Sequence, residues 1–89
     1  MQERRISVTN KLGLHARASA KLVQLVQGFR SQIWLVNGTR EVNAKSIMGV
    51  MMLAAGIGTN LVVRADGPDE GEALEAVIEL FARKFDKGA

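Results

Sequence analysis

The chain carries the stretch QIWLVNGTREV at residues 32–42, and the prediction of the whole fold starts from it. Asn37-Gly38 lies between two runs rich in strand-forming residues, 32–36 and 39–42. An asparagine followed by a glycine readily supplies the two positive φ angles of a type I′ turn. The stretch therefore predicts an antiparallel β-hairpin with its turn at Asn37-Gly38.

Before the hairpin, the pattern predicts a strand and then a helix. Residues 4–9 alternate, with Ile6 and Val8 on one side, which is the period of a half-buried strand, and residues 10–13 form a turn. From residue 16 to residue 27 apolar side chains recur every three to four positions, which is typical of an amphipathic helix. Gly28 ends this helix.

After the hairpin, the pattern predicts a helix, a strand and a final helix. Ser46 is a good cap for a short apolar helix at residues 47–53, and residues 60–66 alternate as a strand. Asp69 and Glu72 have the spacing of a capping box for the last helix. The apolar stripe of that helix consists of Leu74, Val77, Ile78, Phe81 and Phe85.

The predicted order is βαββαβα, and the fold class is α+β. Each strand has one polar face, each helix has one apolar face, and the connections are short. These features favour two layers, with all three helices packed on one face of a four-stranded, largely antiparallel sheet. A chain of 89 residues has apolar material for one core, so we expect one domain over residues 1–89.

Composition excludes several classes of site. With no cysteine and one histidine, the chain has no disulfide, no thiol nucleophile and no multi-imidazole metal site, so we expect no metal and no cofactor. The longest stretch without a polar side chain, residues 47–58, is shorter than the roughly 20 residues that span a bilayer. We expect no membrane insertion. No export signal is evident at residues 1–8, and we expect a cytoplasmic protein.

Charge is unevenly distributed along the chain. Residues 1–65 hold nine Lys and Arg against two acidic residues, a balance of +7, whereas residues 66–89 hold three against seven, a balance of −4. This asymmetry predicts a basic face that meets an acidic protein, a phosphate or a nucleic acid.

His15 lies between the first turn and the first helix, within GLHAR at residues 13–17. The free N–H groups of a helix start welcome an anion, and the guanidinium of Arg17 can hold phosphate oxygens. Imidazole nitrogen, amides and guanidinium together resemble a receiver for a phosphoryl group. The local alternative is that His15 only caps the helix and Arg17 is solvated.

Ser46, the methionines of residues 48–52 and the glycine segment at residues 56–58 each have a structural interpretation as well as a functional one. Ser46 serves as a helix cap, although a phosphate at that position would be tolerated electrostatically. Met48, Met51 and Met52 have helical spacing, which favours core positions over a binding surface. The Gly56-Ile57-Gly58 segment lacks the other residues of a phosphate-binding or dinucleotide-binding loop, and we interpret it as a plain loop.

Two segments, TNKLGLHAR at residues 9–17 and KSIMGVM at residues 45–51, closely resemble the signatures of HPr, the histidine phosphocarrier family of the bacterial phosphotransferase system. The resemblance implies an open-faced βαββαβα sandwich. It also implies that His15 accepts phosphate at Nδ1 from phosphorylated enzyme I, whose donor is phosphoenolpyruvate, and passes it to an enzyme IIA domain. Arg17 would balance the phosphate charge. Such a protein is a carrier and not a turnover enzyme, and we expect a monomer.

The resemblance carries three further implications. Ser46 is the expected target of HPr kinase/phosphorylase. The expected docking patch for partners consists of Ala16, Ala20, Ile47, Met48 and Met51. Ala18 departs from the family pattern, which has proline there, so this helix start has one more N–H group and a less rigid first turn.

The residues leave other functions open. Within the family, a nitrogen-regulatory carrier keeps the same histidine loop, whereas the segment at Ser46 favours the sugar branch. An RNA-binding module would explain the basic half, but Trp34 is the one aromatic residue on a predicted strand, so we expect no nucleic acid partner. A purely regulatory phosphoprotein would use Ser46 and not need His15.

Overall fold

Strands and helices alternate in the predicted order βαββαβα along residues 1–86, the part of the chain that the computed structural model describes. Their bounds are β1 at Gln2–Ser7, α1 at Ala16–Gln27, β2 at Gln32–Asn37, β3 at Arg40–Asn43, α2 at Ile47–Met52, β4 at Asn60–Asp66 and α3 at Glu70–Ala82.

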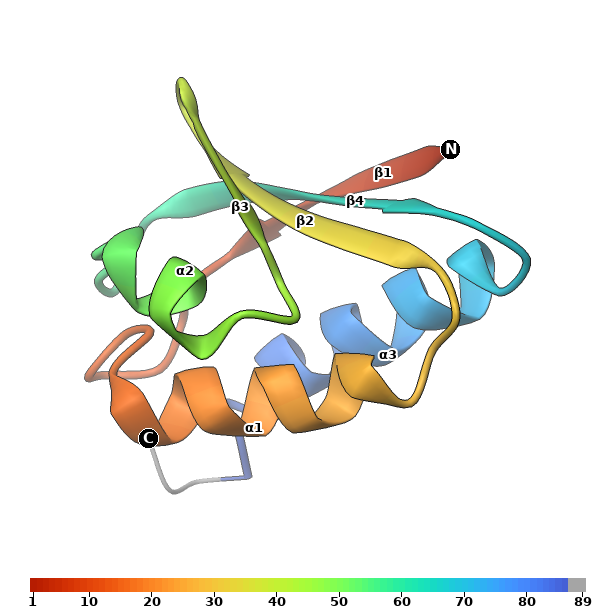
Figure 1. Ribbon diagram of the computed structural model, residues 1–89. Helices are drawn as coiled ribbons and strands as arrows, with labels where there is room; N and C mark the ends of the chain where they lie inside the picture. Colours follow the sequence, from red (N-terminus) through yellow and green to blue (C-terminus); the bar gives the residue numbers. More distant parts are fainter. Residues whose placement is uncertain (87–89) are drawn as a thin grey trace.

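The four strands form one sheet in the order β1-β4-β2-β3, and every neighbouring pair is antiparallel. In the register, Val63 of β4 lies between Arg4 of β1 and Leu35 of β2. Figure 1 shows α1, α2 and α3 beneath one face of this sheet, with the other face uncovered. This arrangement confirms the α+β open-faced sandwich.

The core lies between the sheet and the helices. Alternate residues of the strands, such as Ile33, Leu35, Leu61 and Val63, are buried from the sheet side. The helices contribute side chains at three- and four-residue spacing, which is the pattern of one helical face. Those of α1 and α3 are Ala18, Leu22, Val26, Ala73, Leu74, Val77, Leu80 and Phe81.

The hairpin is present, but its turn is not of the predicted type. Gly38 has a φ of 63°, whereas Asn37 and Thr39 keep negative φ angles. Asn37 pairs with Arg40, so the two central residues are Gly38 and Thr39. This is the glycine-first pattern of a type II′ turn, and it moves the start of β3 to Arg40. At the other edge of the sheet, β1 begins at Gln2 and ends at Ser7 rather than spanning residues 4–9.

The predicted capping box at α3 is wrong. The Asp69 side chain makes no cap hydrogen bond to its own helix. Its carboxylate accepts hydrogen bonds from the Arg30 and Ser31 N–H groups, both at 2.9 Å, and from the Ser31 hydroxyl at 2.6 Å. Asp69 therefore ties the start of α3 to the connection between α1 and β2. Glu70 instead accepts a hydrogen bond from the Gly67 N–H at 3.1 Å.

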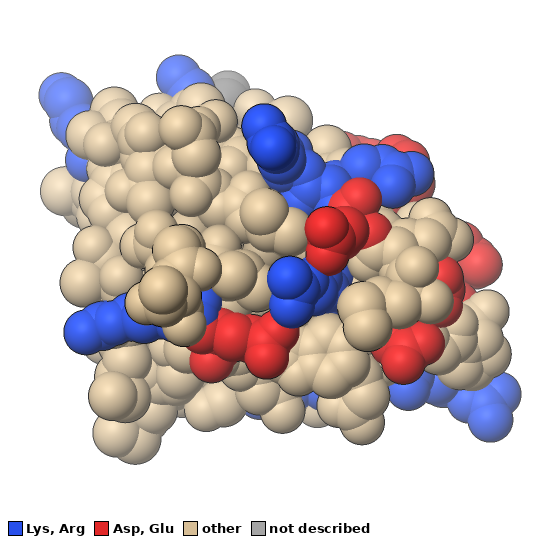
Figure 2. Space-filling view, turned by 90° about the horizontal axis from the view of Figure 1, so that it is seen from above, with Lys and Arg blue, Asp and Glu red and all other residues tan. Residues whose placement is uncertain are grey.

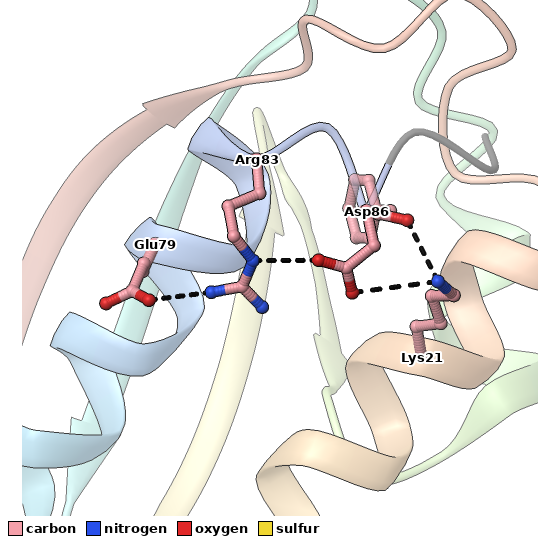
Figure 3. Close-up of polar contacts among 5 residues, drawn as sticks. Lys21, Glu79, Arg83 and Asp86 are labelled. Carbon is pink, nitrogen blue, oxygen red and sulfur yellow. Dashed lines mark hydrogen bonds and ion pairs between the residues drawn. The ribbon is translucent and has the colours of Figure 1, made fainter.

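Phe85 is buried as predicted, but it does not belong to the helix. α3 ends at Ala82, and Lys84, Phe85 and Asp86 have φ angles of 52°, 55° and 61°. This left-handed run turns the Phe85 ring back to Phe81, with ring centroids 4.8 Å apart. Lys21 of α1 donates to the Phe85 carbonyl oxygen at 3.1 Å and pairs with Asp86, which also accepts from Arg83 (Figure 3). These contacts hold the end of α3 against α1.

The uncovered face of the sheet is a mixture of both charges. Arg64 at the centre donates to Glu3 on one side at 2.7 Å and to Glu41 on the other at 2.8 Å. The hydrogen bond to Glu3, assisted by both carboxylates, raises the pKa of Arg64 further above its ordinary value. Figure 2 shows acidic and basic side chains alternating over this face. It is therefore not the continuous basic surface that a nucleic-acid interface needs.

Candidate functional site

His15 is the residue that starts α1. Its backbone is extended, with φ of −76° and ψ of −178°, and its ring nitrogen Nδ1 accepts a hydrogen bond from the Arg17 N–H at 3.3 Å. His15 therefore caps the helix, as the local alternative predicts, and this cap also fixes which ring nitrogen accepts a hydrogen bond. A nitrogen that accepts a hydrogen bond carries a lone pair and no proton, so the neutral ring has its proton on Nε2. The cap geometry thus keeps Nδ1 in its nucleophilic form.

The other ring nitrogen of His15 is enclosed. Nε2 has essentially no solvent-exposed surface and no hydrogen-bond partner among residues 1–86, while the side chain as a whole is half-buried. A partner molecule cannot reach Nε2 without moving the ring. Nδ1 is therefore the nitrogen available for chemistry in this geometry.

The loop before His15 is held at both ends. Asn10 is 1% exposed, and its side-chain amide donates to the Gly13 carbonyl oxygen at 2.7 Å. Gly13 has a φ of 68°, and a Cβ atom there would lie 2.4 Å from the Ala55 carbonyl oxygen. Leu14 donates its N–H to that same oxygen at 2.9 Å. The glycine therefore permits a close approach between this loop and the segment after α2.

Arg17 is exposed at the second position of α1. Its main-chain N–H contacts the imidazole, and its side chain leaves the same helix turn two residues after His15. Ala16 before it is exposed, and Ala20, one turn further on, is half-buried. The first two turns of α1 therefore carry one cation and two small side chains in the residues that directly follow His15.

Ser46 caps α2 as predicted. Its hydroxyl oxygen accepts a hydrogen bond from the Gly49 N–H at 3.1 Å, and the Val50 N–H donates to the Ser46 carbonyl oxygen at 3.0 Å. The side chain is exposed. Ser46 is thus an ordinary helix cap with an exposed side chain.

The α2 methionines are surface residues, so the core positions that their helical spacing favours are wrong, whereas the docking patch implied by the resemblance includes Met48 and Met51. Met48 and Met52 are 70% and 66% exposed, whereas Val50 and Leu53 fill the core positions of this segment. A six-residue helix that packs by one edge has too few inward positions for all its apolar side chains. Ile47 and Met51 are also exposed.

α2 packs on α1 (Figure 1), and the segment that follows α2 contacts the loop before His15 through the hydrogen bond from the Leu14 N–H to the Ala55 carbonyl oxygen. Sequence reasoning missed two further exposed apolar residues: Leu12 in the loop before His15 and Ile57 in the glycine loop. Each is more than 60% exposed. Their positions in polar or glycine-rich loops were the available signal, because apolar residues there have no helix or strand face to fill.

Residues 1–86 contain neither a cluster of metal ligands nor a membrane-spanning helix. No group of three or more His, Cys, Asp and Glu side chains in this part of the chain could hold a metal ion. Among the helices of the same residues, none is long and apolar enough to cross a membrane.

Known proteins resemble this chain both in sequence, including the histidine loop, and in fold. The family model described as "PTS HPr component phosphorylation site" matches residues 2–83. The chain is 56% identical over 88 residues to the phosphocarrier protein HPr of Cupriavidus necator, covering 99% of each chain. It is 39% identical over 87 residues to the phosphocarrier protein NPr of Shewanella violacea, covering 98% of this chain and 96% of that one.

A solved structure shows the same fold. The crystal structure of HPr-C-His from Thermoanaerobacter tengcongensis matches with a TM-score of 0.95 and 44% identity, covering 100% of both chains. Fold and relatives together define a small phosphocarrier of the phosphotransferase system, not a catalytic enzyme. The chain belongs to the HPr family.

Proposed function

We propose that this chain carries a phosphoryl group on Nδ1 of His15, from phosphorylated enzyme I to an enzyme IIA domain in sugar uptake. The observation that carries the proposal is the state of the imidazole: Nδ1 is held as a hydrogen-bond acceptor by the Arg17 N–H, and Nε2 is enclosed. The ring therefore presents one lone pair, at the start of a helix whose free N–H groups favour an anion.

The transfer forms one bond and breaks one. The Nδ1 lone pair attacks phosphorus, and the bond between phosphorus and its donor atom on enzyme I breaks, with the electron pair leaving on the donor. The ring keeps its Nε2 proton and becomes cationic, which makes it a good leaving group when a nucleophile on the IIA domain takes the phosphoryl group. The Arg17 N–H then has phosphoryl oxygens as acceptors in place of Nδ1.

Arg17 supplies the charge that balances this group. The phosphoryl oxygens gain negative charge in both transfers, and a fixed guanidinium beside them stabilises the transition state more than the ground state. In this proposal Arg17 acts equally on receipt and on delivery, because the same group passes the same position twice.

Partner docking uses the apolar surface around the site. The proposed contact residues Ala16, Ala20, Ile47, Met48 and Met51 come from α1 and α2, which pack together. Flexible methionine side chains can adapt to differently shaped partners, and a carrier must bind enzyme I and IIA domains in turn. Because both partners use one surface, the chain binds them one at a time, and we propose that it does so as a monomer.

Ser46 is the proposed regulatory site. Its exposed hydroxyl caps α2 beside the docking surface, so HPr kinase/phosphorylase can reach it and a phosphate there would lie at the rim of that surface. The charge would act on docking rather than on folding.

The experiment that tests the carrier function starts from purified chain, enzyme I and phosphoenolpyruvate. We expect the intact mass to rise by one phosphate, and the phosphate to be lost in acid, because phosphohistidine is acid-labile and phosphoserine is not. His15→Ala should take up none while its circular dichroism is unchanged. Full incorporation by that variant, or uptake without enzyme I, would contradict the proposal.

A nitrogen-regulatory carrier is the second candidate, favoured by the similarity to the NPr relative. The two candidates share the histidine chemistry and differ in the partner. Transfer from the phosphorylated chain to a sugar-branch IIA domain, measured beside transfer to a nitrogen-branch IIA domain, separates them. The higher rate constant identifies the branch.

A further inference from the structure

The first turn of α1 offers more N–H donors to the histidine site than the hydrogen bond to Nδ1 uses. The first helical bond runs from the Ser19 N–H to the His15 carbonyl oxygen, at 2.8 Å. The N–H groups of Ala16, Arg17 and Ala18 precede that bond and have no acceptor inside the helix. The Arg17 N–H donates to Nδ1, whereas the Ala18 N–H has no acceptor within residues 1–86.

Ala18 is the third residue of α1, and the N–H group at this position is close enough to donate to the side chain of a capping residue. The side chain of a capping residue accepts from the N–H of the second or the third helical residue, here Arg17 or Ala18. Nδ1 has one lone pair, and the Arg17 N–H takes it. A phosphoryl group on Nδ1 would place three acceptor oxygens at the same helix end, enough for both N–H groups.

The donor is also fixed in place before any phosphate arrives. The Ala18 side chain is fully buried beneath the helix, so its main chain cannot turn away without disturbing the core. The residue that the family pattern has at this position, proline, lacks this N–H group. Ala18 therefore gives this chain a donor at a position where a proline would supply none.

We propose that the Ala18 N–H donates a hydrogen bond to a phosphoryl oxygen on His15 and so acts as a positioning donor for the carried group. This inference rests on the proposed phosphorylation of Nδ1. This hydrogen bond would stabilise the phosphohistidine. Relative to the phosphorylated donor, the phosphohistidine of this chain should be more stable than that of the same chain with proline at position 18.

Nuclear magnetic resonance tests the hydrogen bond directly. The ¹⁵N-labelled chain is phosphorylated with enzyme I and phosphoenolpyruvate, and the phosphohistidine is verified by its ³¹P signal. We expect the Ala18 amide proton to shift downfield and its nitrogen to show a coupling to phosphorus across the hydrogen bond. Gly49, the third residue of the other capped helix, is the matched control and should not move.

The outcomes separate the two proposals. Phosphohistidine with an unshifted, uncoupled Ala18 amide overturns this inference and leaves the carrier function intact. A chain that takes no phosphate on His15 overturns both.

Two variants at position 18 measure the energetic effect. Ala18→Pro removes the N–H without breaking a helical bond, and Ala18→Gly keeps it. At equilibrium with enzyme I and phosphoenolpyruvate, we expect the proline variant to hold the phosphoryl group about tenfold less favourably than the glycine variant, as for loss of a hydrogen bond to a charged group. Equal equilibria for the two variants would overturn the proposal. Because proline also restricts the Arg17 backbone, the amide signal of the parent chain supplies an independent measurement of the same hydrogen bond.

Discussion

Arg17 has two separate contacts with the proposed chemistry, one through its main chain and one through its side chain. The N–H orients the imidazole by its hydrogen bond to Nδ1, and that bond survives any substitution other than proline. The guanidinium contributes its charge from an exposed position. Side-chain substitutions at Arg17 therefore test the guanidinium while the hydrogen bond to the imidazole stays in place.

We expect Arg17→Ala to slow both phosphoryl transfers by about 10²–10³-fold, the usual effect of removing one donor to developing negative charge. Lysine at this position should restore only part of the rate, because a point charge cannot hold two oxygens as the planar guanidinium does. Single-turnover transfer at saturating partner measures the step itself. Parent rates in both variants would remove Arg17 from the mechanism.

Gly13 is the residue on which the position of the histidine loop depends. Gly13→Ala would place its Cβ 2.4 Å from the Ala55 carbonyl oxygen, in addition to the cost of a left-handed φ. Gly38→Ala is the matched control, since Gly38 has a φ of 63° and no atom within 4 Å of its Cβ position.

Urea unfolding should show the difference between the two glycines. We expect Gly38→Ala to lower the free energy of unfolding by about 1–2 kcal/mol, the cost of the left-handed conformation alone. Gly13→Ala should lower it by more than its control, because the loop and Ala55 must also separate. It should also slow phosphorylation of His15. Equal losses in the two variants would show that the close approach at Ala55 is readily relieved.

At the residue scale, sequence reasoning located what depends on near neighbours. His15 and Ser46 were placed as helix caps, and both cap, because a cap is decided within three residues along the chain. The exposure of Met48 could not be predicted in the same way. Whether a side chain of a short helix points inward depends on how α2 packs on the rest of the fold, which spacing alone does not contain.

At the element scale, the same distinction separates correct from incorrect predictions. The hairpin was predicted because strand propensity and a turn signal coincide, yet the turn moved by one residue, to Gly38-Thr39. A type I′ turn needs positive φ at both central residues, whereas a type II′ turn needs it at the first, and the pairing of Asn37 with Arg40 makes that residue Gly38. Asp69 likewise had the spacing of a cap, but Ser31 and Arg30, distant in sequence, hold its carboxylate.

The contacts of Asp69 predict a pH dependence of stability. The Ser31 hydroxyl, with the Arg30 N–H, holds the pKa of Asp69 below its ordinary value. Since the folded pKa lies below the unfolded one, ionised Asp69 stabilises the fold fully above pH of about 4, the ordinary Asp value. That contribution disappears as the pH falls through the lowered folded value.

Asp69→Asn should therefore destabilise the chain near neutral pH and make its stability less dependent on pH in the acidic range. Glu75→Gln, at an exposed position of α3, removes the same charge as a control. Thermal unfolding of the three proteins from neutral to acidic pH measures both effects. If the parent and Asp69→Asn curves run parallel down to the lowest pH, the contacts of Asp69 do not depend on its charge.

At the scale of the whole molecule, the uneven charge of the sequence is partly cancelled and partly retained. The carboxylates of Glu3 and Glu41 pair with Arg64 on the uncovered face of the sheet. Residues 1–65 contain two acidic residues, and these are Glu3 and Glu41. The histidine end, with Lys11 and Arg17, lies in the basic half and lacks acidic residues in the segments that form it. Electrostatic attraction therefore favours an acidic partner at that end.

Ser46 lies where this attraction would be most easily reversed. A phosphate, or an aspartate in its place, adds negative charge beside Ile47 and Met48, on the surface that an acidic region of enzyme I is proposed to contact. The cap itself would survive, because aspartate accepts the Gly49 N–H as serine does. We expect Ser46→Asp to lower the rate of His15 phosphorylation through weaker binding, with stability unchanged or slightly raised by the helix dipole.

The control for this last prediction is Ser46→Asn, which keeps a capping oxygen of the same size without the charge. Calorimetric titration with enzyme I at two ionic strengths compares the three proteins. We expect the asparagine variant to bind like the parent and the aspartate variant to bind more weakly, with the difference shrinking at the higher ionic strength as the charges are screened. Equal affinity of the two variants at low salt would mean that charge at position 46 does not reach the partner, and Ser46 would then remain a structural cap of α2.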